Sequence, residues 1–275
     1  NMITGVIKAP WGPGKQLSSI QLQLGGKQMQ AVILCGGKGL RMNRLTASQP
    51  KPLAELNGKP IIWHIMNHFS KYGVRDFILP LGYKGELIRD YFNHYYTNHM
   101  DYKLNLSDNR MEYLDEFSHD WTITFADTGV ETQTGGRIKM IEKYVTEDNF
   151  FVTYGDGLGN IDIGALLEHH ISMDRLATVT GVDYRSQYGV LSVKNGAATA
   201  FKEKPLLSLI INAGFFVFSK SVFQYLPDDK RASLETTLLK KLTAIDELSV
   251  YKHDGFWIGI DTYKDLLSAQ HNFSR

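Results

Sequence analysis

The chain has 275 residues, a formal net charge of +1 and a hydrophobic fraction of 43%, all ordinary values for a globular protein. This length can bury a full hydrophobic core, and the composition excludes collagen-like, coiled-coil and disordered chains. The near-neutral charge gives no whole-chain reason to expect nucleic acid or an anionic membrane as a partner. The single cysteine, Cys35, excludes an internal disulfide and a thiolate zinc cluster, and it favours a reducing, cytoplasmic compartment.

Residues 1–28 differ in composition from the rest of the chain. They contain lysines, prolines and glycines but no acidic residue, so no long helix is expected there. Two interpretations stay open: a tag-like, vector-derived or mis-started leader, or a natural flexible arm whose alternating Ile20, Leu22 and Leu24 add a strand to a neighbour. Residues 29–275 are expected to form one domain, because no linker or repeat interrupts them.

Short apolar runs alternate with segments of helical periodicity between residues 30 and 182. The expected strands are 30–35, 76–81, 122–126, 149–154 and 177–182. The expected helices are 61–72, 86–96, 137–144 and 163–172. This alternation predicts an α/β fold with a Rossmann-like, mostly parallel sheet flanked by helices. The carboxyl ends of its strands would share one edge, where ligands bind.

After residue 183 the pattern changes to shorter strand-like pieces followed by two helices. The pieces are 189–193, 199–202 and a buried strand at 210–218, and the helices are 219–225 and 233–242. They predict small C-terminal β/α additions to the same domain. No stretch approaches the roughly 20 apolar residues of a membrane helix, so no membrane partner is expected.

A glycine-rich segment, Gly36 to Arg41, directly follows the first expected strand. Glycines let the backbone approach a phosphate and offer it N–H donors, and an arginine adds a bidentate cation. The segment matches neither a Walker A motif nor the dinucleotide fingerprint. It indicates a phosphate site, with a simple tight turn as the alternative for this loop taken alone.

Two further loops carry charged residues whose surroundings suit a phosphate site. Lys51 stands between Pro50 and Pro52, which stiffen the chain around a cation that can be aimed at an anion. Asp156 lies between glycines at the end of a strand and can bind Mg²⁺ beside a phosphate, with Asp261 as its candidate partner. For each residue taken alone, an exposed loop lysine or a turn or cap aspartate is the competing interpretation.

A fourth segment places Glu203 beside Lys204 in a polar island between strands, ahead of Asn212. A lysine suits a phosphate and a glutamate accepts from hydroxyls, so the pair suits a phosphorylated polyhydroxy ligand. A charged, solvent-facing turn is the alternative for this segment taken alone.

The order of these segments resembles the sugar-1-phosphate nucleotidyltransferases: GG-x-G-x-R, PKP, TGGR, YGDG, EKP, and then GFW with DT. The segments 59–66, 82–85, 127–129 and 134–137 are most similar to the glucose-1-phosphate cytidylyltransferases, which make CDP-glucose. The likeness spans about residues 29–270. No single motif is decisive, but their order and spacing together are specific.

The resemblance implies an enzyme of polysaccharide biosynthesis that forms a CDP-sugar and pyrophosphate from CTP and a sugar 1-phosphate, with Mg²⁺ as cofactor. It implies catalytic roles for Arg41, Lys51 and Asp156, and a metal site at Asp156 and Asp261. The implied nucleotide contacts are Leu34, Gly36, Gly37, Gly39, Arg41, Lys51, Thr132, Arg137, Gly155 and Asp156. The implied acceptor contacts are Glu203, Lys204 and Asn212. A homo-oligomer is also implied.

Departures from the family pattern cluster on the acceptor side, at 184–189, 212–214 and 232–235. The acceptor therefore stays open between glucose 1-phosphate and another phosphorylated molecule, sugar or non-sugar. The nucleotide stays open between CTP and either UTP or dTTP. A catalytically silent nucleotide-binding subunit is a further possibility, and the presence of all four residues Arg41, Lys51, Asp156 and Asp261 argues against it.

Overall fold

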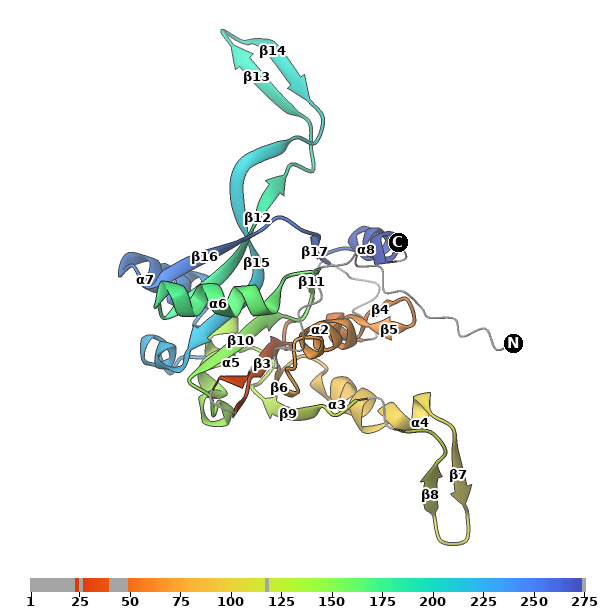
Figure 1. Cartoon of the computed structure of the whole chain (residues 1–275). Helices are drawn as coiled ribbons and strands as arrows, with labels where there is room; N and C mark the ends of the chain where they lie inside the picture. The colour runs from red at the N-terminus through yellow and green to blue at the C-terminus, as the bar shows by residue number, and fades with distance from the viewer. Residues whose placement is uncertain (1–22, 25–26, 40–48, 117–118, 274–275) are drawn as a thin grey trace, which may run out of the picture.

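A seven-stranded sheet runs through the centre of the computed structural model, which describes residues 23–24, 27–39, 49–116 and 119–273 (Figure 1). In spatial order its strands are β16 (Leu248–His253), β12 (Ala177–Arg185), β15 (Leu206–Ser219), β10 (Asn149–Tyr154), β3 (Gln30–Leu34), β6 (Asp76–Leu81) and β9 (Thr122–Asp127). β15 pairs antiparallel with both of its neighbours, and the other four pairings are parallel. The predicted mostly parallel sheet is confirmed, and the segment after residue 183, expected to form small additions, contributes β15 and β16 to the sheet itself.

Helices and short hairpins surround this sheet. The α-helices are α2 (Ile61–Ser70), α3 (Gly85–Asn93), α4 (Tyr95–His99), α5 (Thr134–Met140), α6 (Ile163–Met173), α7 (Lys240–Ala244) and α8 (Tyr263–Phe273). The 3-10 helices are η2 (Lys51–Leu53), η3 (Glu142–Tyr144) and η4 (Lys220–Tyr225), and η5 (Leu234–Leu239) is a π-helix. The two-stranded pairs are β1 (Gln23–Leu24) with β2 (Lys27–Gln28), β4 (Glu55–Leu56) with β5 (Lys59–Pro60), β7 (Tyr102–Asn105) with β8 (Arg110–Tyr113), β11 (Gly157–Gly159) with β17 (Trp257–Gly259), and β13 (Val190–Lys194) with β14 (Ala197–Lys202).

The central strands form where the sequence has short, continuous apolar runs, the pattern of strands covered on both faces. Every side chain of β3 is buried. Ala31 and Ile33 belong to one apolar cluster and Val32 and Leu34 to another. Since neighbouring residues of a strand point to opposite faces, these two clusters cover the two faces of the sheet.

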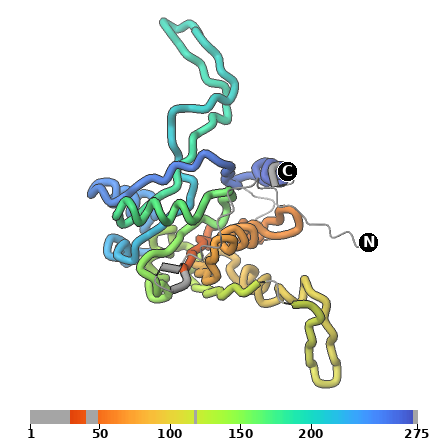
Figure 2. The backbone as a smooth tube through the Cα atoms, viewed as in Figure 1, coloured from red at the N-terminus to blue at the C-terminus, as the bar shows by residue number. Residues whose placement is uncertain are grey.

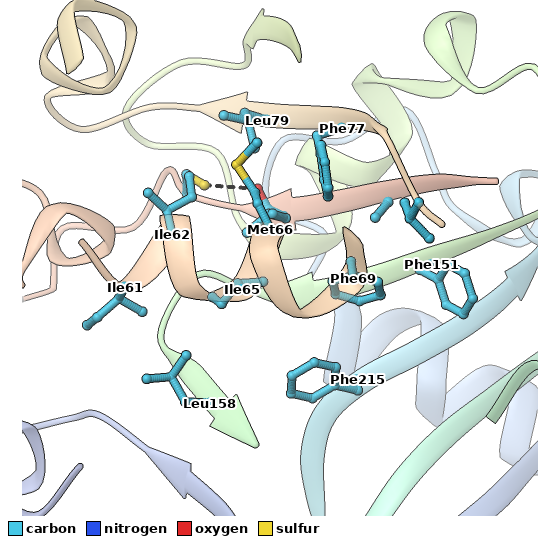
Figure 3. Packing of buried hydrophobic residues seen from close by; sticks show 14 of the residues in the cluster. Ile61, Ile62, Ile65, Met66, Phe69, Phe77, Leu79, Phe151, Leu158 and Phe215 are labelled. Carbon is cyan, nitrogen blue, oxygen red and sulfur yellow. Dashed lines mark hydrogen bonds between the residues drawn. The ribbon is translucent and has the colours of Figure 1, made fainter. Parts of the chain in front are cut away.

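Helix α2 shows how a periodic segment joins this core. Its buried residues recur at helical spacing: Ile61, Ile62, Ile65, Met66 and Phe69. The Phe69 ring lies 5.4 Å from the Phe151 ring and 6.0 Å from the Phe215 ring, centroid to centroid (Figure 3). The helix is thereby fixed against β10 and β15.

Two hairpins project from the body of the molecule (Figures 1 and 2). We call the β13–β14 hairpin, with the outer parts of β12 and β15, the arm. The sequence predicts a buried strand at 210–218, but only its residues from Ala213 to Phe218 are buried, and Ile210 is 55% exposed. The reason is position, because the first half of β15 leaves the sheet for the arm, where no second layer covers it.

Most other predicted elements are confirmed with shifted ends, and a few were missed. The helix expected at 86–96 is divided into α3 and α4 because His94 leaves helical geometry, with φ −102° and ψ 13°. The helix expected at 137–144 begins earlier, at Thr134. The β7–β8 hairpin, β16 and α8 were not predicted. Residues 1–22 and 25–26 of the predicted leader lie outside the described residues.

Within the described part of the chain, no helix has the length and apolar character needed to span a membrane.

Candidate functional site

A cleft of about 740 Å³ opens beside the ends of β3 and β10. Its walls come from the end of β3 and the residues after it, from η2, from the start of α5, from the end of β10, from η5, and from β17 with the residues that follow it. Parallel pairing of β3 and β10 sets Leu34 opposite Tyr154, so the segments that continue from these two strands leave the sheet side by side. This is the sheet edge at which the sequence predicted a ligand.

The cleft brings together three charged side chains that are far apart in the sequence. The Lys51 ammonium donates to Asp156 Oδ2 at 2.7 Å and to Asp261 Oδ1 at 2.9 Å, across 105 and 210 sequence positions. The Lys51 side chain is only 9% exposed, whereas those of Asp156 and Asp261 are 38% and 49% exposed. The lysine is therefore fixed below two carboxylates that remain open to the cleft.

Local structure explains why these residues meet. Pro50 is extended and Pro52 lies in the first turn of η2, which holds Lys51 at its start. The β11–β17 ladder pairs Gly157 with Gly259, and the Ile260 N–H donates to the Asp156 carbonyl at 2.9 Å. Asp156 precedes one strand of the ladder and Asp261 follows the other, so the ladder sets them next to each other.

The two open carboxylates fit a Mg²⁺ ion. Mg²⁺ prefers oxygen ligands and keeps several waters, usually combining one or two carboxylates with substrate phosphates. Across the described residues no group of three or more histidine, cysteine, aspartate or glutamate side chains is arranged to hold a metal, so Asp156 and Asp261 would need phosphate or water to complete a site. The donor set thus suits a metal that arrives with a phosphorylated substrate.

Arg137 lies beneath the glycine-rich loop rather than in the cleft wall. This arginine is 3% exposed, and its guanidinium donates to the carbonyls of Gly36 and Leu81, each at 2.9 Å, and to Thr128 Oγ1 at 2.5 Å. Thr132 is also buried and donates to the Thr128 carbonyl. These two predicted nucleotide contacts therefore support the loops around the cleft, and Arg137 places a buried positive charge under the segment that follows β3.

Gly36→Ala is expected to destabilise the protein, because a Cβ at Gly36 would overlap the guanidinium carbon of Arg137. Overpacking of this kind costs about 1–3 kcal/mol, measurable as the free energy of unfolding in denaturant. Gly37→Ala is the matched control, since a Cβ there meets nothing within 4 Å. Equal unfolding free energies for the two variants would show that the Arg137 side chain moves aside without loss of stability.

Gly155 allows the ends of β3 and β10 to approach closely. Its N–H donates to the Leu34 carbonyl at 3.0 Å, and a Cβ on it would lie 2.9 Å from that same oxygen. Cys35 follows Leu34 and is fully buried, and burial raises the pKa of its thiol, which stays protonated. Cys35 is therefore a small packing residue in this structure.

Sequence reasoning missed Tyr154 and Glu235 as site residues. Both line the cleft, and the Tyr154 hydroxyl donates to Glu235 Oε1 at 2.5 Å. Burial raises the pKa of Tyr154, and so does its bond to this carboxylate. Glu235 stands two residues after Ser233, which caps η5, so its sequence position indicates only an acidic residue in the first turn of a helix.

The structure brings one part of the predicted site together in the cleft and places other parts outside its wall. Residues of the cleft wall include the predicted Leu34, Gly37, Gly39, Lys51, Gly155, Asp156 and Asp261. Asn212 does not line the cleft, but its side chain accepts at 2.7 Å from the N–H of Gly214, which packs against the Tyr154 ring. Glu203 and Lys204 are exposed on the arm and do not line the cleft. Arg41 lies outside the described residues.

Comparison with known proteins agrees with this geometry. The family described as "Nucleotidyl transferase" matches residues 30–275. The chain is 50% identical over 241 residues to the probable glucose-1-phosphate cytidylyltransferase of Bacillus subtilis, covering 88% of this chain and 94% of that protein. It is 39% identical over 239 residues to the glucose-1-phosphate cytidylyltransferase of Salmonella typhimurium, covering 86% and 93%.

The fold shows the same relationship. The crystal structure of HddC from Yersinia pseudotuberculosis superposes with a TM-score of 0.66 at 25% identity, covering 90% of this chain and 100% of that chain. A family match over nearly the whole chain, two relatives above 30% identity and a shared fold lead to one conclusion. The chain belongs to the nucleotidyl transferase family, and it is an enzyme of that class.

Proposed function

We propose that this enzyme transfers the cytidylyl group of CTP to glucose 1-phosphate, forming CDP-glucose and pyrophosphate. The observation that carries the proposal is the buried Lys51 ammonium beneath two open carboxylates in the cleft. The names of the Bacillus and Salmonella relatives support CTP and glucose 1-phosphate as the substrate pair.

The reaction joins two anions, and the cleft supplies what they need. An oxygen of the sugar phosphate forms a bond to the α-phosphorus of CTP, and the bond from that phosphorus to the pyrophosphate oxygen breaks. The attacking oxygen is already ionised, so no general base is required. The work is charge neutralisation and in-line positioning.

The chain's own residues divide this work. Lys51 neutralises charge near the α-phosphate, and the backbone around Gly37 and Gly39 lines the cleft where a triphosphate is expected. Arg41 is proposed as a second cation on the triphosphate. Mg²⁺ bound by Asp156 and Asp261 would supply Lewis-acid stabilisation of phosphate charge.

Competing enzyme functions differ in substrate rather than in chemistry. UTP or dTTP in place of CTP, or another phosphorylated acceptor, would use the same cluster. A silent nucleotide-binding subunit would not need Lys51, Asp156 and Asp261 gathered in one cleft, and their contact argues against it.

The test is pyrophosphate release with Mg²⁺, CTP and glucose 1-phosphate, with UTP, dTTP, ATP and GTP in parallel and a panel of other phosphorylated acceptors. Turnover with CTP and glucose 1-phosphate alone is the expected result. Turnover with CTP and a different acceptor would show that glucose 1-phosphate is not the substrate, while the proposed mechanism would still hold. Failure with every pair would overturn the proposed function.

Lys204→Ala tests whether the arm takes part in acceptor binding. Because an ammonium group suits the acceptor's phosphate, we expect the KM for glucose 1-phosphate to rise about tenfold, with a smaller change in the KM for CTP. Lys194→Ala, an exposed lysine of β13 on the same arm, is the matched control. An equal rise in the KM values for glucose 1-phosphate and CTP would show that Lys204 does not bind the acceptor specifically.

A homo-oligomer is part of the same proposal. The two projecting hairpins expose large apolar side chains, including Leu191, Val193 and Phe201 on the arm and Leu104 and Leu106 on the other hairpin. Exposed apolar patches of this kind mark association surfaces. Light scattering that gives the mass of a single 31.1 kDa chain would contradict it.

A further inference from the structure

We propose that Glu235 recognises a hydroxyl group of the sugar acceptor and that Tyr154 holds its carboxylate in position. This inference rests on the proposed function and deepens it. It names a residue for the neutral, hydroxyl-bearing part of a substrate, whereas Lys51, Asp156 and Asp261 all address phosphate.

The Glu235 carboxylate is bonded to two other elements and to the cap of its own helix. It accepts from the Tyr154 hydroxyl at the end of β10 at 2.5 Å, from Ser233 Oγ before η5 at 2.6 Å, and from Thr134 Oγ1 at the start of α5 at 3.2 Å. A carboxylate fixed by this many bonds is preorganised, so a ligand does not have to immobilise it.

A sugar hydroxyl can enter this arrangement by exchange. The bond from Thr134 is the longest of the three, and Thr134 and Glu235 both line the cleft. A ligand hydroxyl that replaces the threonine hydroxyl substitutes one O–H donor for another, so the carboxylate keeps its hydrogen bonds. The exchange therefore leaves neither carboxylate oxygen of Glu235 without a donor.

The charge of Glu235 separates it from the other cleft carboxylates. Asp156 and Asp261 contact the Lys51 ammonium, whereas the side-chain partners of Glu235 are hydroxyl groups. Burial raises the pKa of Glu235, but the bonds from Ser233, Tyr154 and Thr134 outweigh it and the pKa is lowered, so the group is ionised at neutral pH. An ionised carboxylate repels phosphate and accepts from hydroxyls.

The sheet order connects this carboxylate to a strand that carries a predicted acceptor residue. β10 lies between β3, which leads into the glycine-rich loop, and β15. The Tyr154 ring packs on the β15 side, where a Cβ at Gly214 would overlap the ring. Tyr154 therefore joins the Glu235 carboxylate to β15, the strand that carries Asn212, a residue that the sequence assigned to the acceptor.

The first experiment compares Glu235→Gln with the unmodified enzyme. Loss of a charge-assisted hydrogen bond should raise the KM for glucose 1-phosphate about 10- to 100-fold and leave the KM for CTP within about twofold. Glu168→Gln is the control, because Glu168 is exposed on α6 and away from the cleft lining. Equal increases in both KM values would overturn the proposal.

A second measurement identifies the group that is recognised. Glucose 1-phosphate analogues that each lack one hydroxyl are compared as substrates of the two enzymes. The unmodified enzyme should lose about tenfold in kcat/KM with one analogue, and Glu235→Gln should lose nothing further with that same analogue. Additive losses for every analogue would mean that Glu235 has only a structural role. Tyr154→Phe should show the same pattern with a smaller effect, since it removes one of the bonds that position the carboxylate.

Binding separates failure of this inference from failure of the proposed function. By calorimetry, Glu235→Gln should bind CDP about as tightly as the unmodified enzyme and CDP-glucose at least about tenfold more weakly. Weaker binding of CDP as well would assign Glu235 to the nucleotide. If the unmodified enzyme bound neither ligand, the proposed function itself would be wrong.

Discussion

Asp156→Ala should reduce turnover by at least about a thousandfold, the largest effect expected of a single carboxylate in this cleft. The substitution removes one of the two open carboxylates and one of the two acidic partners of the Lys51 ammonium. Pyrophosphate release at saturating Mg²⁺, CTP and glucose 1-phosphate measures the loss.

Two variants make this result specific. Asp156→Asn keeps the size of the side chain and should be nearly as inactive, because the negative charge is what a metal requires. Asp246→Asn changes an exposed aspartate outside the cleft lining and should keep normal turnover. Unchanged activity of Asp156→Ala at saturating Mg²⁺ would exclude the metal role.

Lys51→Met is expected to reduce kcat by about 100- to 1,000-fold. The cation is buried under Asp156 and Asp261, so its removal leaves two carboxylates facing the phosphates with no ammonium between them. Both their repulsion of the triphosphate and the lost charge neutralisation act against the transition state. The measurement is single-turnover formation of CDP-glucose, which isolates the chemical step from product release.

The choice of methionine keeps the apolar stem of Lys51 and limits disturbance of η2. A thermal melt within a few degrees of the unmodified enzyme would show that the fold is retained. Lys51→Arg should not restore activity, because the larger guanidinium does not fit a site that leaves the lysine side chain 9% exposed. A kcat for Lys51→Met close to that of the unmodified enzyme would show that Lys51 takes no part in the chemical step.

Much of the fold was predictable from local pattern. β3, β6 and β10 are continuous apolar runs because both faces of the sheet are covered, and α2 carries its apolar residues at helical spacing. Elements whose burial depends on distant partners were harder to predict. The edge strand β16 mixes polar and apolar residues, and the first half of β15 is apolar but exposed on the arm.

The family and the chemical types in the site could be read from the amino-acid sequence. The order of its motifs identified a nucleotidyl transferase, and loops after strands supplied a lysine and two aspartates suited to phosphate and metal. These features are readable locally, because a strand, a glycine turn and a charged side chain each express their tendencies within a few residues.

Which residues meet became visible only in the folded molecule. The β11–β17 ladder brings Asp261 to Asp156, and packing buries Arg137 beneath the glycine-rich loop, where it bonds to Gly36. The bond between Tyr154 and Glu235 joins residues 81 positions apart. Local periodicity carries no information about such contacts, because they depend on how separate elements pack and on which polar groups must find partners once water is excluded.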